Sequence, residues 1–290
     1  MRLQKLSKVL MGTFVITLVA TLAIGAGSKD LAGGAHKLAY RMKKGQRLQY
    51  KTTLTVQNSM EIQGREMATG SDVNSMLHLE VEEVGKDGRI TYVYALDSLQ
   101  VKIKTPQMDS TLKNPEGMIG KRTRQIMTAF GKKLKTVIVD SVQLPGIMAQ
   151  SGGRQSAFRF IELPEKEVKI GDSWTMSTPD TSTQMNSKII LTPTATYTLA
   201  GEVDTLGYKC LRLNYKGKTS ITGNGVNMGM NFSIEGEGPI SGTAYFAPKE
   251  ALLVAVVGDS DLETTVALTG QMSMTIPQST ATQLAIVLVK

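Results

Sequence analysis

Residues 48–62 read LQYKTTLTVQNSMEI, and this stretch decides the fold class. The mostly apolar residues lie at even-numbered positions: Leu48, Tyr50, Thr52, Leu54, Val56, Met60 and Ile62. Polar residues lie at the odd-numbered positions: Gln49, Lys51, Thr53, Thr55, Gln57, Ser59 and Glu61. Alternation over this length predicts a long strand with one buried face, because a helix would scatter these positions around its axis. Other strands must flank it, so the sequence predicts a mainly β protein built on an antiparallel sheet.

Composition bounds the class of protein and its partners. The chain has 290 residues, of which 41% are hydrophobic and 20% charged, an ordinary globular balance. Its formal charge of +8 falls to +5 if Arg2, Lys5 and Lys8 are removed with the N-terminal segment. One Trp and six Phe give few rings on which bases could stack, so nucleic acid is not expected as a partner.

The N-terminus has the three parts of an export signal. A basic start precedes an uncharged run from Val9 to Ile24 and then small residues that end at Ser28. We expect residues 1–26 to be a signal peptide cleaved after Ala26, with an uncleaved anchor helix as the alternative. The only cysteine is Cys210, so neither a cysteine-linked lipid anchor nor an internal disulfide is expected. The predicted location is periplasmic or extracellular.

One segment departs from period two. Ile119, Ile126, Met127 and Phe130 recur at helical spacing, which predicts one principal amphipathic helix over about 116–130. Lys121, Arg122 and Arg124 lie between them, followed by Lys132, Lys133 and Lys135. This basic face could meet an anionic membrane surface, and a plainly solvated face is the alternative.

Residues 27–290 are predicted to form one β-rich domain, because nearly all of this range shows strand patterns separated by turns. The apolar residues lie at even positions from Ile90 to Leu96 and at odd positions from Leu99 to Ile103. This change around Asp97 and Ser98 predicts a β-bulge. Residues 169–176 align with 43–50, which predicts two quasi-repeats, about 38–105 and 166–222, with chance similarity as the alternative. Apolar runs at 252–257 and 284–289 predict strands buried on both faces.

Glycines punctuate the C-terminal strands and predict bulges and bends in a strongly curved sheet. They are Gly223, Gly225, Gly229, Gly236, Gly238 and Gly242.

No catalytic constellation emerges. Gly-Asp-Ser occurs at 171–173 and 258–260, but a Ser-His-Asp site needs a suitably placed histidine and only His36 and His78 exist. Neither histidine has a set of metal ligands around it. Methionine pairs such as Met228 and Met230 could bind Cu(I), but period two explains them as an apolar wall. We therefore expect a non-enzymatic protein without metal or cofactor.

Several turn and strand motifs together resemble a known family. They are Leu163-Pro164, the stretch from Val168 to Trp174, and the hairpin from Tyr245 to Lys249. In their overall pattern of strands and turns they are similar to uncharacterised exported bacterial β-rich proteins and, distantly, to the lipoprotein-carrier superfamily. The resemblance implies a large curved antiparallel half-barrel whose apolar concave side, partly covered by helix, holds acyl chains. An outer-membrane barrel is the competing architecture, but aromatic residues are sparse and the chain ends at Lys290.

The function predicted from these observations is binding of a lipid-like or other hydrophobic ligand. The predicted ligand-binding residues are Met228, Met230, Phe232, Met272 and Met274. Methionine is flexible and adapts to mobile chains, which favours this set. A structural or partner-binding envelope protein with a filled core is the alternative, because alternation alone does not distinguish a lined pocket from packed residues.

Overall fold

The structure is a computed structural model that describes residues 34–289 except 63, 107, 142–157, 185–186, 228–229 and 271–272. The predicted signal peptide, residues 1–26, lies outside the described residues. Within the described residues, no helix has the length and apolar character needed to cross a membrane.

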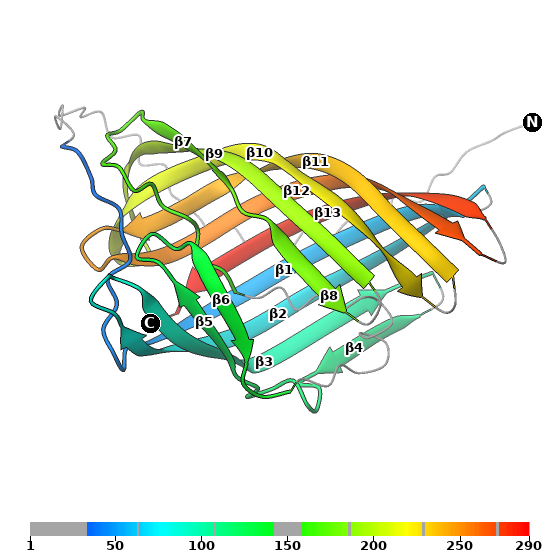
Figure 1. Ribbon diagram of the computed structural model, residues 1–290, viewed down its shortest axis with the longest axis horizontal. Coiled ribbons are helices and arrows are strands. Elements are labelled where there is room, and N and C mark those ends of the chain that lie inside the picture. The colour runs from blue at the N-terminus through cyan, green and yellow to red at the C-terminus, as the bar shows by residue number, and fades with distance from the viewer. Residues whose placement is uncertain are drawn as a thin grey trace, which may run out of the picture. The chain divides into compact units, whose positions relative to one another are not determined.

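In the described part of the chain, thirteen antiparallel strands form one sheet (Figure 1). The strands are β1 (Arg47–Ile62), β2 (Arg65–Val84), β3 (Ile90–Lys104), β4 (Asp109–Lys113), β5 (Thr123–Met127), β6 (Lys133–Ile138), β7 (Ser173–Ser177), β8 (Asp180–Gln184), β9 (Ser187–Thr205), β10 (Tyr208–Asn227), β11 (Met230–Ala247), β12 (Leu252–Thr269) and β13 (Met274–Leu288). Their order is β6-β5-β3-β2-β1-β13-β12-β11-β10-β9-β7, with β4 beside β3 and β8 beside β9. The first and last long strands, β1 and β13, therefore pair at the middle of the sheet.

Period-two patterning is confirmed where it was strongest. The predicted strand at 48–62 is β1, paired with β2 on one side and β13 on the other. The predicted bulge is also confirmed: Met76 pairs with Ser98 and Leu77 with Leu96, which leaves Asp97 as the extra residue. Of the run 252–257, residues 252–256 are buried as expected, but Val257 is 39% exposed. The expectation for 284–289 is wrong, because most of that run is only half-buried.

The predicted helix over 116–130 is wrong. This segment contains turns and β5, and β5 pairs with β6 in a hairpin. Thr123, Gln125 and Met127 are the buried residues of β5, so its true period is two. The helical spacing of the large apolar residues arises because β5 contributes Ile126 and Met127, one from each face, while Ile119 belongs to a turn before it.

The sheet has two faces of opposite character. The inner face is the one that bears Tyr50, Leu79 and Tyr92, all fully buried. The outer face bears the alternate residues, among them Lys51, Glu80 and His78, which are exposed or half-buried. Along β11, from Met230 to Gly242, half-buried residues on the inner face alternate with exposed residues on the outer face. Beyond Gly242 the inner residues Ala244 and Phe246 are buried in the core.

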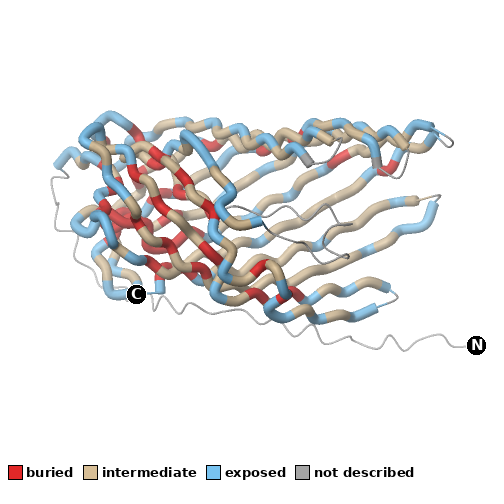
Figure 2. The backbone as a smooth tube through the Cα atoms, turned by 60° about the horizontal axis from the view of Figure 1, so that its bottom comes forward, coloured by how far each residue is buried: buried red, intermediate tan, exposed pale blue. Residues whose placement is uncertain are grey.

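The hydrophobic core lies at one end of the inner face. Two extended segments cover this end: 34–42, which contributes Leu38, Tyr40 and Met42, and 158–168, which contributes Phe158 and Phe160. Figure 2 shows most of the buried residues gathered at this end, while the other ends of the long strands are mostly half-buried or exposed. We call the two regions the covered end and the uncovered end.

Aromatic rings hold the two covering segments against the sheet. Phe158 lies 4.7 Å from Tyr50 of β1, and Phe160 lies 5.6 Å from Tyr92 of β3, measured between ring centroids. Tyr40 packs edge-on against Phe246 of β11 at 5.6 Å. The two segments are also joined to each other by a hydrogen bond, since Tyr40 Oη donates to the Ile161 carbonyl at 3.0 Å.

The two edges of the sheet meet beside the covered end. Asp180 of β8 forms ion pairs with Lys133 of β6 at 2.7 Å and with Arg159 of the second covering segment at 3.3 Å. Strands β6 and β8 lie far apart in the order of the sheet, so these contacts require the sheet to curl. The predicted strong curvature is thereby confirmed.

Two turns support the alignment of residues 43–50 with 169–176. Gly45 and Gly171 both have a left-handed φ, of 78° and 97°. Each donates its N–H to a neighbouring strand, Gly45 to Val81 and Gly171 to Leu199. The residue after each glycine bonds back to the lysine that opens the turn. The turns are locally alike, and the quasi-repeats over 38–105 and 166–222 stay a prediction.

Candidate binding surface on the inner face

The inner face continues beyond the core as an uncharged surface. On β1 it begins at Leu54, and the flanking strands β2 on one side and β13, β12, β11 and β10 on the other continue it. Its residues include Leu54, Val56, Asn58, Met60, Ser71, Val73, Leu262, Leu284, Thr282, Ile234 and Phe232, all half-buried. From Leu54 to Met60 and at the positions opposite them on these strands, no inner residue carries a charge. We call this surface the uncovered inner face.

Rows across the strands alternate in chemistry. Leu284, Leu54 and Val73 form an apolar row across β13, β1 and β2. In the next row on the same face, Val56 lies between the hydroxyl residues Thr282 and Ser71. The uncovered inner face therefore combines aliphatic contact area with neutral hydrogen-bonding groups.

Two of those neutral groups have no partner. The Oδ1 atom of Asn58 on β1 and the Oγ1 atom of Thr219 on β10 are buried, and neither forms a hydrogen bond within the described part of the chain. A buried polar atom without a partner costs roughly 1–3 kcal/mol.

Three of the five predicted ligand-binding residues lie in the described part of the chain. Met230 and Phe232 open β11, and Met274 opens β13. Phe232 pairs with Leu268 of β12, which pairs with Met274, so two of the three share one row of the uncovered inner face. Met228 and Met272 lie outside the described residues. The ligand-binding role of this set stays a prediction.

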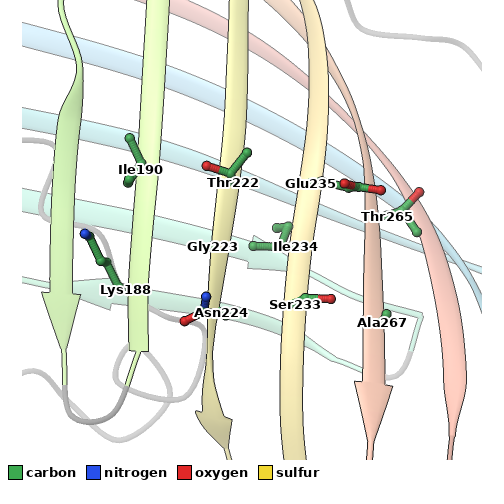
Figure 3. A pocket seen from close by; sticks show the side chains of 10 residues that line it. All are labelled: Lys188, Ile190, Thr222, Gly223, Asn224, Ser233, Ile234, Glu235, Thr265 and Ala267. Carbon is green, nitrogen blue, oxygen red and sulfur yellow. The ribbon is translucent and has the colours of Figure 1, made fainter.

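A depression lies on the opposite side of the sheet, on the outer face of β9 to β12 (Figure 3). Its volume is about 440 Å³. The charged residues in its lining are Lys188 of β9 and Glu235 of β11, and between them β10 contributes Thr222 and Asn224. These four side chains are exposed to solvent. A similar depression of about 310 Å³ lies on the outer face around Lys51 and Asn74. Both fit a solvated face better than a site.

The Gly-Asp-Ser triplets do not form nucleophilic sites. Asp259 and Ser260 are consecutive in β12, so one side chain points outward and the other inward. Ser173 shares a hydrogen bond with Thr198 at 2.8 Å, and Asp172 accepts the Lys169 N–H within its turn. Neither serine lies beside a histidine in the described structure.

The histidines lie in different surroundings. His78 Nδ1 lies 2.5 Å from Asp97 Oδ1 on the outer face, where Gln49 Nε2 also donates to that carboxylate at 2.9 Å. His36 forms an isolated backbone bridge with Val168. Among the residues that the structure describes, no three His, Cys, Asp or Glu side chains form a group that could hold a metal ion.

Three of the six basic residues in the segment 121–135 form ion pairs. Arg124 donates to Glu82 at 2.6 and 3.0 Å, and Lys133 pairs with Asp180. Arg122 Nε donates to Asp140 at 2.8 Å. The predicted continuous basic helix face is therefore replaced by separate ion pairs at one edge of the sheet. Contact with an anionic membrane surface stays a prediction.

We expect the Arg122–Asp140 pair to break only in strong acid. Hydrogen bonds from the Arg122 side chain and backbone lower the pKa of Asp140 from 3.8 to about 2. A depressed carboxyl pKa stabilises the folded state above pH 3.8, and that contribution is lost as the pH falls towards 2. An NMR titration of the Asp140 carboxyl should give this low value, and Arg122→Gln should return it towards normal. A near-normal pKa in the unmodified protein contradicts the pairing.

Comparisons with known proteins found little at the level of sequence. No protein family matches the chain, and no curated protein is a recognisable relative. Among solved structures, the chain is similar to an outer membrane channel from Pseudomonas putida F1, with 8% identity, a TM-score of 0.30, and coverage of 87% of this chain and 98% of the channel. It is also similar to the translocator domain of the autotransporter NalP from Neisseria meningitidis, with 8% identity, a TM-score of 0.22, and coverage of 85% and 89%.

These findings correct three expectations drawn from the sequence. The matched structures are a channel of the outer membrane and a translocator domain, so the expected likeness to the lipoprotein-carrier superfamily is wrong. The expected role as a lipid carrier is wrong for the same reason, and the expected periplasmic or extracellular location, drawn from the export signal, is overturned by the match to a channel of the outer membrane. The implied helical cover is also wrong, because extended segments cover the inner face.

The similarity to the two matched proteins is limited to antiparallel β architecture. Barrel strands in a membrane present an apolar band to lipid. Here the outer face of β11 and β12 carries charges at alternate positions, namely Glu235, Glu237, Asp259, Asp261 and Glu263, all exposed. The end strands β6 and β7 are not paired with each other in the described sheet, which is therefore open.

Proposed function

We propose that this protein is a non-catalytic binding module whose uncovered inner face receives an extended, uncharged and largely apolar polypeptide segment. The covered end of the same face carries the proposal. There, two extended segments of the chain already lie across the inner strands and bury apolar side chains such as Leu38 and Phe160 against them. The uncovered inner face continues the same strands and the same parity, so a similar cover suits it.

The chemistry of the face favours a polypeptide over a purely hydrocarbon ligand. Apolar rows such as Leu284, Leu54 and Val73 can bury aliphatic side chains. The half-buried hydroxyl residues Thr282 and Ser71 offer hydrogen-bonding groups that can pair with a peptide backbone but not with a hydrocarbon chain. A charged segment is disfavoured, because its charge would be buried without an ion-pair partner.

The size of the face sets the length of the partner. The run from Leu54 to Ile62 spans about 26 Å at ~3.3 Å per residue. Burying one large aliphatic side chain contributes about 1.5–3 kcal/mol, whereas association costs on the order of 4–15 kcal/mol. Several side chains must therefore bind together, and a segment of eight to ten residues is about the right length.

Non-catalytic binding also agrees with what the described side chains can do. The candidate nucleophiles have neither a base nor an oxyanion site beside them, and the inner face has no titratable group between Leu54 and Met60. Proton transfer and nucleophilic attack both require such groups. Binding requires only area, shape and neutral hydrogen bonds, all of which this face provides.

A pair of neighbouring substitutions tests the proposal. Val56 points to the inner face, and Gln57 is exposed on the outer face of the same strand. The probe is a labelled, end-blocked ten-residue peptide in which Leu and Thr alternate, followed by fluorescence anisotropy. Val56→Glu should weaken binding about tenfold or more, because covering an unpaired carboxylate costs more than ~1.4 kcal/mol. Gln57→Glu should leave binding unchanged.

Circular dichroism of both variants establishes that each remains folded. Equal affinity of the two folded variants, or no binding by the unmodified protein, rejects the uncovered inner face as the binding surface. An equal loss for both would show that charge in general, and not this face, controls binding.

A further inference from the structure

Strand β6 presents an unusual edge. It is the last strand of the sheet and pairs only with β5 among the described residues. Large apolar side chains on and just beyond it are exposed, with Leu134 at 47%, Ile138 at 70% and Val139 at 36%. Exposed edge strands that carry apolar residues are templates for pairing with another strand. The surface formed by residues 132–139 is called the β6 edge here.

The backbone of β6 has groups directed away from β5. Val139 donates its N–H to the Arg122 carbonyl at 3.1 Å, which makes 122 and 139 a bonded pair. In an antiparallel ladder bonded and non-bonded pairs alternate, so the N–H and C=O groups of Ile138 and Thr136 point towards the free edge. An added strand would find two residues whose backbone groups face it.

The charge of the edge selects the partner. Lys132, Lys133 and Lys135 lie on it, and only Lys133 has an ion pair, with Asp180, within the described structure. A second copy of β6 would bring more lysines and no carboxylate from its strand. A partner strand with carboxylates would offset Lys132 and Lys135, so the β6 edge suits an acidic strand better than itself.

We propose that the β6 edge binds an extended polypeptide segment in which acidic residues alternate with β-branched residues, added as a further antiparallel strand. Its backbone pairs with Thr136 and Ile138, its apolar side chains cover Leu134 and Ile138, and its carboxylates lie beside Lys132 and Lys135. This site is separate from the uncovered inner face and differs from it in ligand charge.

Two labelled ten-residue peptides test this inference on the full chain by fluorescence anisotropy. One alternates Glu with Val and Thr, and the other replaces every Glu by Lys. The acidic peptide should bind at least about tenfold more tightly than the basic one. Ile138→Lys should weaken acidic-peptide binding about tenfold, whereas the matched control Ile170→Lys, an exposed Ile in a turn, should not. A Lys132→Glu, Lys135→Glu double variant should reverse the preference.

The alternatives give different results. Equal binding of the two peptides, or equal effects of Ile138→Lys and Ile170→Lys, overturns the inference. Dimerisation that Ile138→Lys abolishes assigns the edge to a second copy and also overturns it. So does retention on anionic phospholipid vesicles with no peptide binding. The neutral Leu-Thr peptide should not compete with the acidic one, because the two peptides bind different sites. The results for the β6 edge and for the uncovered inner face are therefore independent of each other.

Discussion

Replacing Phe160 by Ala is expected to lower the free energy of unfolding by about 3–5 kcal/mol. Phe160 is 1% exposed and belongs to the covering segment, not to a strand. Its ring lies 4.9 Å from Tyr40, 4.9 Å from Phe158 and 5.6 Å from Tyr92, so its loss opens a cavity among three rings. Urea denaturation followed by circular dichroism measures the change.

The same substitution at Phe232 provides the control. Phe232 is also on the inner face but is only half-buried, at the uncovered end. Its replacement by Ala should cost much less, because the ring leaves water only in part. Similar losses for Phe160→Ala and Phe232→Ala contradict the division of the inner face into covered and uncovered ends.

Strand positions could be predicted because their signals are local. The alternation from Leu48 to Ile62 and the phase flip at Asp97 each depend on residues that are neighbours in sequence. Pairing, by contrast, brings Tyr50 beside Leu288, and nothing near either residue indicates this partner. The sequence therefore predicts which residues are strands and which face is apolar, but not the order of the strands.

The covering segments were missed for a related reason. Leu38, Tyr40 and Met42 alternate, as do Phe158 and Phe160, so each segment carries a weak strand signal. Neither joins a ladder; each lies across the sheet and is held by ring contacts to residues such as Tyr50, far along the chain. Short alternating runs next to turns are the signal that could have identified them.

The candidate surface was predicted only in part. Phe232 and Met274 were expected in one apolar wall, and they do share a row. The extent of the face could not be predicted, because alternation looks the same whether the inner parity is packed against a cover, as at Tyr50, or left half-buried, as at Val56. Only the position of the covering segments distinguishes the two, and those contacts are long-range.

Replacing Gly238 by Ala is expected to destabilise the fold by about 1–3 kcal/mol through overpacking. Gly238 lies on the inner face of β11, where a Cβ would overlap the carbonyl oxygen of Asp261 and lie 2.8 Å from the Cα of Leu262. Both atoms are backbone of β12, so no side chain can turn away to make room. Urea denaturation measures the loss, and Ser241→Ala, on the exposed outer face of the same strand, should stay within about 0.5 kcal/mol of the unmodified protein.

The sign of the Gly238 effect distinguishes two roles for the inner glycines. Within a strand Ala is intrinsically more stable than Gly by roughly 0.5–1 kcal/mol, so a glycine that only interrupts the sheet should give a more stable Ala variant. The register of β11 runs unbroken past Gly236 and Gly242 against β10, so these glycines mark no bulge there. If glycine instead allows β11 and β12 to approach closely at this position, Ala must force the two strands apart. A stabilised Gly238→Ala variant therefore contradicts the close approach of these strands, and a destabilised one supports it.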